Sequence, residues 1–117
     1  MREIKFRAWD EVEKRFWHFD LNEVLKRHLS YVGSWDVKIA TGKKEQYTGF
    51  EDVNDKEIYE GDIAEYYSLL NGGLQLGVVT FENGCWHIGE CYLHHKNVKI
   101  VGNVCENKDL IMKGFMR

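Results

Sequence analysis

The sequence contains no proline, and only three of its 117 residues are cysteine. Without proline, turns must rest on glycine, asparagine and aspartate, which tolerate the backbone conformations that turns require. An odd number of cysteines with no apolar leader segment predicts a protein of the reducing cytosol rather than a disulfide-linked secreted protein. No stretch approaches the roughly 18 apolar residues of a transmembrane helix, so we expect no membrane partner.

Basic charge is not in excess either, because 16 basic and 19 acidic residues give a formal net charge of −3. Dedicated nucleic-acid binders usually carry a clear basic excess, although this balance leaves nucleic acid open as a partner. Residues 51–65 hold seven acidic residues and one lysine, a local net charge of −6 that leaves +3 on the rest of the chain. This segment is either a solvated hairpin or an acidic decoy of a host DNA-binding or defence protein.

The chain length predicts one domain over residues 1–117 with a modest core. Apolar and polar residues alternate along most of the chain, and this period of two is typical of β-strands. Strands are expected at residues 4–9, 15–19, 37–40, 46–50, 58–59, 63–67, 74–82, 85–92 and 98–104. Many short strands with close turns predict a mainly β fold, a small barrel or sandwich.

Turn residues separate several of these strands. Asn83-Gly84 is the strongest hairpin signal, because both residues accept the positive φ angles of a two-residue turn. Residues 71–73 and 52–55 are expected to form turns for similar reasons. The first two strands are expected to form an N-terminal hairpin.

Two short helices are also expected. Apolar residues recur with helical spacing over about residues 20–30, and Asp20 is the candidate N-cap of this inserted helix. A C-terminal helix is expected over residues 106–113, with Asn107 as its N-cap.

A group of cysteine and histidine residues is the one candidate metal site. Its spacing is poor, because the chain has no Cys-x-x-Cys pair and no pair of histidines four residues apart. On a continuous strand over 85–92, the first and last cysteines would lie about 20 Å apart. The weak metal candidates are Cys85, His87, Cys91, His94 and His95, with Cys105 further along the chain.

No motif for catalysis or cofactor binding occurs. The chain has neither the Gly-x-Ser-x-Gly nucleophile turn nor a glycine-rich phosphate loop. We therefore expect no cofactor, no catalytic residue and no enzymatic activity. The alternative is a small hydrolytic or metal-dependent enzyme that uses Cys85, His87 or the His94-His95 pair.

Four blocks of sequence carry a resemblance to a known family. They are MREIKFRAWD (1–10), YTGFEDVNDKEIYEGDIAEY (47–66), GVVTFENGCWHI (77–88) and VKIVGNVCEN (98–107). Through these blocks, which span nearly the whole chain, the sequence resembles the YopX family of phage and prophage proteins. The resemblance implies a largely β domain with an SH3-type small barrel and an origin in a phage or prophage. It implies no activity.

Side chains of the second block either form strand-to-turn junctions or line a shared binding surface. Asp62 would accept backbone N–H groups in a turn, and Tyr59 would pack its ring inside. An aromatic strip with neighbouring lysines at 38, 43 and 44 is a second possible surface, suited to single-stranded nucleic acid. The candidate binding residues are Trp35, Tyr47, Tyr59, Glu60 and Asp62.

The favoured function is that of a non-enzymatic β-barrel interaction module. Its partner is expected to be a host or phage protein, with nucleic acid as another option, in the cytosol of a bacterial host. Small β proteins with exposed strands and aromatic residues readily pair, so we also expect a homo-oligomer.

Overall fold

The computed structural model describes residues 3–22 and 44–109. The chain groups into two compact units, Met1–Tyr47 and Thr48–Arg117. Residues 23–30 and 110–113 of the two expected helices, and the expected strand at 37–40, lie outside the described residues. In the described parts of the two expected helices, only residues 21–22 and 108–109 are helical. No helix among the described residues is long and apolar enough to cross a membrane.

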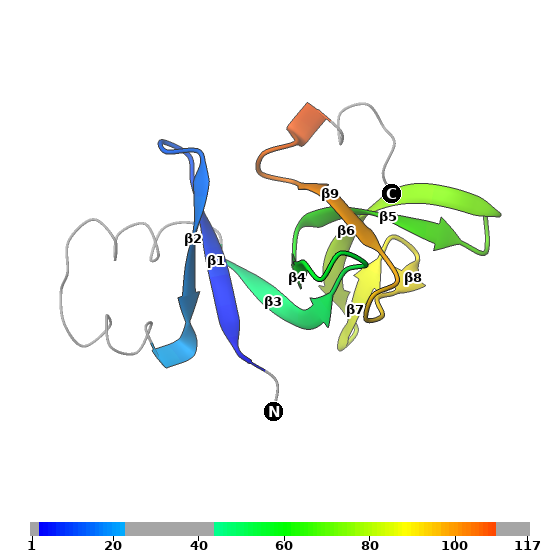
Figure 1. The fold of residues 1–117 in the computed structure, drawn as a ribbon, viewed down its shortest axis with the longest axis horizontal. Coiled ribbons are helices and arrows are strands. Elements are labelled where there is room, and N and C mark those ends of the chain that lie inside the picture. Colours follow the sequence, from blue (N-terminus) through cyan, green and yellow to red (C-terminus); the bar gives the residue numbers. More distant parts are fainter. Residues whose placement is uncertain (1–2, 23–43, 110–117) are drawn as a thin grey trace. The chain divides into compact units, whose positions relative to one another are not determined.

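The described residues are mainly β, with two antiparallel sheets (Figure 1). One sheet has the strand order β2-β1-β3-β4, and the other has the order β8-β7-β6-β5-β9. The strands are β1 (Lys5–Asp10), β2 (Arg15–Asp20), β3 (Lys44–Glu51), β4 (Glu57–Tyr59), β5 (Asp62–Ser68), β6 (Gly73–Glu82), β7 (Cys85–Ile88), β8 (Cys91–Tyr92) and β9 (Lys99–Asn103).

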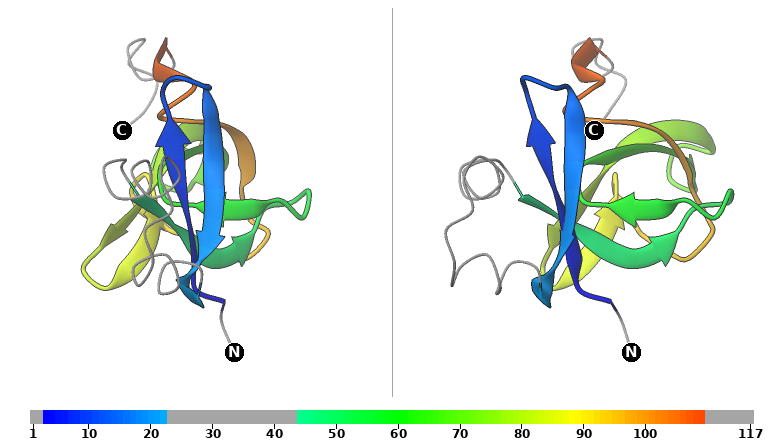
Figure 2. Two further views of the ribbon diagram at one scale, coloured as in Figure 1. Left: turned by 90° about the vertical axis from the view of Figure 1, so that its left-hand side faces the viewer. Right: turned by 60° about the vertical axis from the view of Figure 1, so that its left-hand side comes forward.

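In the first unit, β1 and β2 form the expected N-terminal hairpin (Figure 2). The carboxylate of Asp10 organises its turn. Oδ1 accepts the backbone N–H groups of Val12 and Glu13, at 3.0 and 3.1 Å. Oδ2 accepts the indole N–H of Trp17 at 2.9 Å, which ties the turn to β2. Short polar side chains commonly hold turns in this way.

A buried ion pair joins β1 to the start of β3 within the first unit. Arg7 Nε lies 2.8 Å from Glu45 Oε1, and both side chains are buried. The two residues are also direct cross-strand neighbours. The Arg7 guanidinium lies over the Phe16 ring at 4.0 Å, so its apolar face is covered as well.

In the second unit, two of the expected turns are confirmed. β6 and β7 are joined by Asn83-Gly84, with φ of 52° and 79°, and the flanking residues Glu82 and Cys85 face each other. Positive φ at both central residues is the signature of a type I′ turn. The turn after Ser68 is also present, because Gly72 N–H donates to the Ser68 carbonyl at 2.8 Å.

The expected turn at 52–55 is confirmed, and a single buried carboxylate holds it. Asp52 Oδ1 accepts the N–H groups of Asn54 and Lys56, at 2.8 and 2.9 Å. Its Oδ2 accepts the N–H of Ile100 at 3.0 Å, which lies on β9 far along the chain. Asp52 therefore stabilises its own turn and also attaches that turn to the edge of the second sheet.

Two more Asx side chains organise the second unit. Asp62 Oδ2 accepts the N–H of Tyr59 at 2.8 Å, which confirms the expected turn role of Asp62. Asn103 Oδ1 accepts the N–H groups of Cys105 and Glu106, at 3.0 and 2.8 Å, and so shapes the end of β9. Asn107, the expected N-cap, accepts the N–H of Asn103 at 3.1 Å.

The core of the second unit takes its side chains from β4, β5, β6 and β7 and from the segment between β8 and β9. Tyr66 and Trp86 contribute the aromatic part of this cluster, and Phe50, Cys91 and Ile100 pack against its margin. Its buried members are Ile58, Ala64, Tyr66, Val79, Trp86, Ile88, Leu93 and Val98.

The expected SH3-type barrel is not found, because both sheets of the described residues are open. The edge strand β9 shows why its sheet does not continue. The N–H groups of Ile100 and Asn103 bond to the side chains of Asp52 and Asn107 instead of to another strand. Side-chain acceptors thus protect this edge without closing it into a barrel.

The expected continuous strand over 85–92 is also wrong. The chain reverses at Gly89-Glu90, so that Ile88 faces Cys91 across a short hairpin between β7 and β8. Gly89 adopts a φ of 57° there, a conformation that favours glycine.

We predict that Asp52→Asn lowers the free energy of unfolding at pH 7 by about 1–3 kcal/mol, because the amide NH₂ would face the Ile100 N–H donor. Burial acts to raise the pKa of Asp52, but the three N–H donors and the Lys56 charge outweigh it, so its pKa lies below the ordinary value. The Asp52 contribution is therefore present above about pH 3.9 and is lost as pH falls through the lowered pKa. Urea denaturation at several pH values measures this.

The matched control is Asp55→Asn, which changes an exposed carboxylate of the same turn that pairs with Lys96. This variant should unfold near the wild-type urea concentration. The role of Asp52 would be refuted if both variants unfolded at the same urea concentration at pH 7.

Candidate functional site

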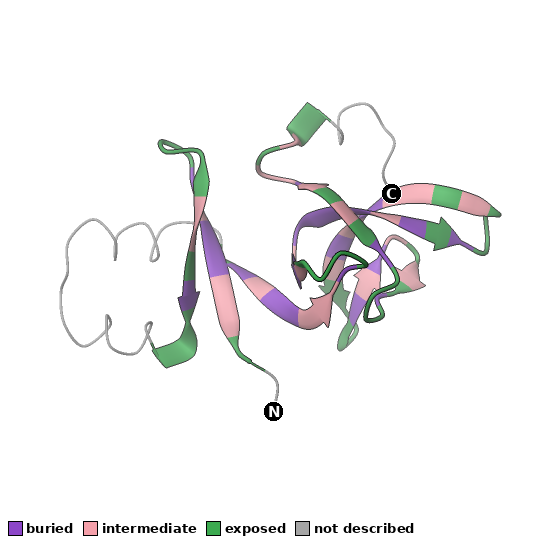
Figure 3. Ribbon diagram, viewed as in Figure 1, coloured by how far each residue is buried: buried purple, intermediate pink, exposed green. Residues whose placement is uncertain are grey.

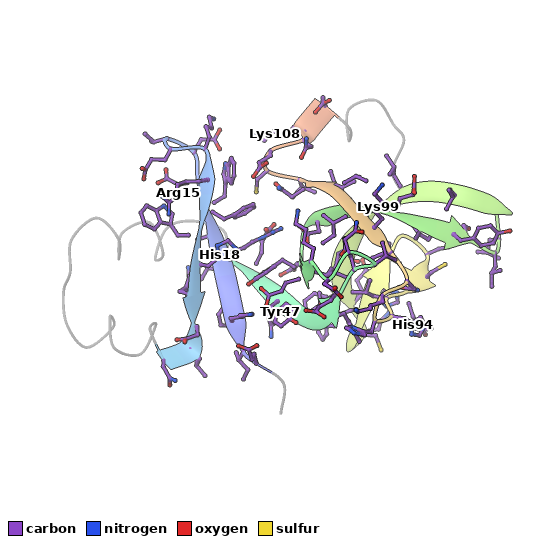
Figure 4. All side chains as sticks on the ribbon, in the orientation of Figure 1. Arg15, His18, Tyr47, His94, Lys99 and Lys108 are labelled. Atoms are coloured by element: carbon purple, nitrogen blue, oxygen red, sulfur yellow. The ribbon has the colours of Figure 1, made fainter. Side chains whose placement is uncertain are left out.

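The structure places most of the candidate binding residues inside. Tyr47, Tyr59 and Asp62 are buried, and Glu60 is half-buried. The N–H of Tyr59 donates to the Asp62 carboxylate across the β4–β5 turn. Tyr47 belongs to the first unit (Figure 4). The Lys5 ammonium lies 4.7 Å from the centroid of the Tyr47 ring. Trp35 lies outside the described residues. The shared binding surface stays a prediction, and buried rings offer a partner little area.

The cysteine and histidine candidates are spread over β7, β8 and the loop that follows. Cys85 is exposed, and Cys91 is half-buried. His87 packs its ring 5.0 Å from that of Tyr92, and His95 Nδ1 accepts the N–H of Glu51 at 3.1 Å. Within residues 3–22 and 44–109, no group of three histidine, cysteine or acidic side chains is placed to hold a metal ion.

The acidic run is divided between interior and surface. Asp52 and Asp62 are buried and serve as acceptors in turns. Asp55 forms an ion pair with Lys96, and Glu65 lies opposite Lys99 on β9 (Figure 4). Several of the seven carboxylates thus have structural roles, which reduces the acidic surface available to a decoy.

Large apolar side chains gather on the surface at the far end of the β5–β6 hairpin. Leu69 and Leu70 occupy its turn and are 84% and 81% exposed. Tyr67 and Leu74, 58% and 67% exposed, face each other across the two strands. Figure 1 shows this end of the hairpin reaching beyond β7 and β8, and Figure 3 shows its exposed positions. Exposed apolar groups that cluster in this way mark interaction sites.

The outer part of the hairpin, residues 66–81, is also free of charge. No charged residue occurs between Glu65 and Glu82, although 30% of the chain is charged. Sequence reasoning missed these residues, because it treated the segment only as two strands and a turn. The gap in charge was the signal that would have found them, since exposed strands normally carry charges that keep other chains away.

The opposite face of the hairpin is attached to the β7–β8 turn through Glu90. Its Oε2 accepts the hydroxyl of Tyr66, and its Oε1 accepts the hydroxyl of Ser68. Tyr66 and Ser68 are buried and lie on β5, on either side of the exposed Tyr67. Ser68 Oγ also accepts the N–H of Asn71 at 3.2 Å, so the clamp extends into the turn. We call Tyr66, Ser68 and Glu90 the Glu90 clamp.

Two glycines make this close approach possible. A Cβ atom on Gly89 would collide with the hydroxyl oxygen of Tyr66. A Cβ atom on Gly77 would lie 2.9 Å from Tyr66 Cε1 and 3.0 Å from the backbone nitrogen of Gly89. The absence of side chains at these positions lets β5, β6 and the β7–β8 turn pack around one tyrosine.

The chemistry of the clamp suits a structural role. Burial, the hydrogen bond to Glu90 and the negative charge of Glu90 raise the pKa of Tyr66 to about 12. The phenol therefore stays protonated and donates at neutral pH. The hydroxyl groups of Tyr66 and Ser68 donate charge-assisted hydrogen bonds to one carboxylate, and these bonds hold the hairpin against the β7–β8 turn.

We predict that Glu90→Gln lowers the pKa of Tyr66 from about 12, because the amide removes the negative charge but keeps an acceptor oxygen. Burial keeps the value above the ordinary pKa of about 10. Titration of ¹³Cζ-labelled tyrosine by NMR, with Tyr66→Phe for assignment, measures the change. Glu82→Gln, in an exposed residue of the same unit, should leave it unaltered, and an unmoved Tyr66 resonance in Glu90→Gln would contradict the prediction.

Comparisons with known proteins agree with this mainly β structure. The fold is similar to that of protein EF1440 from Enterococcus faecalis, known from a crystal structure, with a TM-score of 0.59 and 17% sequence identity. The similarity covers 95% of this chain and 99% of the other. No curated protein matches the sequence. The family model described as YopX protein matches residues 5–112, nearly the whole chain, and the chain therefore belongs to the YopX family.

Proposed function

We propose that this YopX-family chain is a non-enzymatic binding module, encoded by a phage or prophage, that acts on a host or phage protein in the bacterial cytosol. The observation that carries this proposal is the exposed, uncharged end of the β5–β6 hairpin. A monomeric protein has no folding reason to keep four large apolar side chains in water on one hairpin. The binding residues are Tyr67, Leu69, Leu70 and Leu74.

The way in which the hairpin is held supports binding. The Glu90 clamp fixes one face of β5, so the other face is presented on a rigid support. A surface that is ordered before binding loses less conformational entropy when the partner arrives. Tyrosine and leucine side chains supply the apolar anchors that a small interface needs.

The enzyme alternative has less support. This alternative would use Cys85, His87 or the His94-His95 pair. His87 Nε2 lies 3.2 Å from the carbonyl oxygen of Glu82, and His95 Nδ1 accepts the N–H of Glu51, so these ring nitrogens contact the backbone rather than a thiol nucleophile. Nucleic acid is a weaker candidate partner than protein, since the hairpin carries no basic residue. The acidic decoy stays a prediction, with fewer accessible carboxylates than the sequence suggests.

The test is affinity capture from the cytosol of a bacterial host with the wild-type chain and with Leu69→Ser/Leu70→Ser. Both leucines are exposed, so the double variant should keep its stability. We expect the variant to recover the bound protein about tenfold less well or worse, because it loses the two most exposed of the four apolar side chains. Quantitative mass spectrometry of the captured proteins gives the measurement.

The matched control is Val53→Ser, an exposed apolar residue in a turn of the same unit. It should capture the same protein at the wild-type level. If the double variant recovered everything that wild type recovers, the hairpin would not be the binding element.

A further inference from the structure

The apolar end of the β5–β6 hairpin has to be matched to one kind of partner. We infer that this partner is a second copy of the same chain, and that two copies pack their hairpins face to face. The inference rests on the proposed function, since it names the protein bound at that surface.

The register of the hairpin defines the face that would meet its copy. Tyr67 lies directly opposite Leu74, and Glu65 lies opposite Leu76, so these residues point to the same side. Tyr66 points to the other side, where Glu90 holds it. The exposed Tyr67–Leu74 pair is therefore at the centre of the free face, with Leu69 and Leu70 at its end.

The absence of charge is the feature that favours self-association. In a two-fold contact each surface meets its own image, so any charge in it is placed near an identical charge. The chain has a net charge of −3, and its acidic segment, residues 51–65, ends at Glu65 on the inner margin of this face. The charge of Glu65 is offset by Lys99, which lies opposite it on β9, and residues 66–81 carry no charge to repel a second copy. Two hairpins can meet there with apolar contact alone.

Other partners fit this surface less well. Proteins select a different protein partner largely through complementary charges, and residues 66–81 of the hairpin have none to offer. Peripheral binding to an anionic membrane needs basic residues beside the apolar ones. The lysine at the base of the hairpin, Lys99, lies opposite Glu65, whose charge offsets it.

Contact between two copies would remove the apolar side chains of Tyr67, Leu69, Leu70 and Leu74 from water. Paired sheets pack through the side chains that project from their facing surfaces. Tyr67 supplies a broad ring with few rotatable bonds, and the leucines fill the space around it. The clamp on the opposite face keeps the hairpin from bending away from its copy.

Sedimentation velocity over a concentration series tests the inference on the full chain. Wild type should show reversible dimer formation. Leu74→Glu should weaken it at least tenfold, because two like charges are brought together at the centre of the contact. Leu70→Glu, in the turn rather than in a strand, serves as the second variant should Leu74→Glu perturb the fold. Val53→Glu, a charge added in another exposed turn of the unit, should dimerise as wild type does.

A mixing experiment adds a readout that a merely structural effect would not produce. Leu74→Glu and Leu74→Lys should each be monomeric alone, and an equimolar mixture should recover dimers through opposite charges. Wild type that stays monomeric up to millimolar concentration, or glutamate variants that dimerise like wild type, would overturn the inference.

The arms of the test separate this inference from the proposed function. If wild type is monomeric but Leu69→Ser/Leu70→Ser still loses a captured protein, the second copy is the wrong partner and the binding surface stands. If wild type floats with vesicles of phosphatidylcholine and phosphatidylglycerol, and the double variant does not, the occupant is a lipid surface and the inference fails.

Discussion

Three backbone N–H groups converge on the buried carboxylate of Asp52, and the second unit depends on this arrangement. Two of the donors belong to its own turn, and the third belongs to β9, so one side chain joins segments far apart in the sequence. Asp10, Asp62 and Asn103 organise other turns in the same way. A chain without proline cannot preset φ at its turns, and here carboxylate and amide oxygens define them through hydrogen bonds instead.

This constraint also explains part of the acidic segment. Asp52 and Asp62 each supply a hydrogen-bond acceptor that a turn of the second unit uses. Glu90 extends the same chemistry to the candidate site, where a carboxylate holds two hydroxyls of β5. The carboxylates of Asp52, Asp62 and Glu90 thus stabilise the fold of the second unit. The uncharged outer part of the hairpin is a different set of residues, and the proposed function depends on that set.

Local patterns predicted the parts of the fold that local forces determine. The β1–β2 hairpin follows from alternation, and the turn at Asn83-Gly84 follows from the conformational freedom of its two residues. The reversal at Gly89-Glu90 was missed because it depends on Tyr66, a residue that reaches this turn only in the folded unit. The SH3-type barrel is not confirmed, because at the β9 edge side-chain acceptors take the place of a neighbouring strand, through long-range contacts that local patterns do not report. The burial of Tyr59, by contrast, agrees with the strand-to-turn role that the sequence suggests for its block.

The charge-free hairpin has a consequence for the unfolded chain. Its second strand contains the run Gly77-Val78-Val79-Thr80-Phe81, which combines strong β-propensity with no charge and no proline. When folded, Gly77 and Val78 pair with β5, and residues 79–81 pair with β7, so every residue of the run has a partner strand. When the chain is newly made or unfolded, Glu65 and Glu82 are the gatekeepers that bracket the segment and oppose aggregation. Replacing the exposed Glu82 by a neutral residue would therefore reduce the yield of soluble protein.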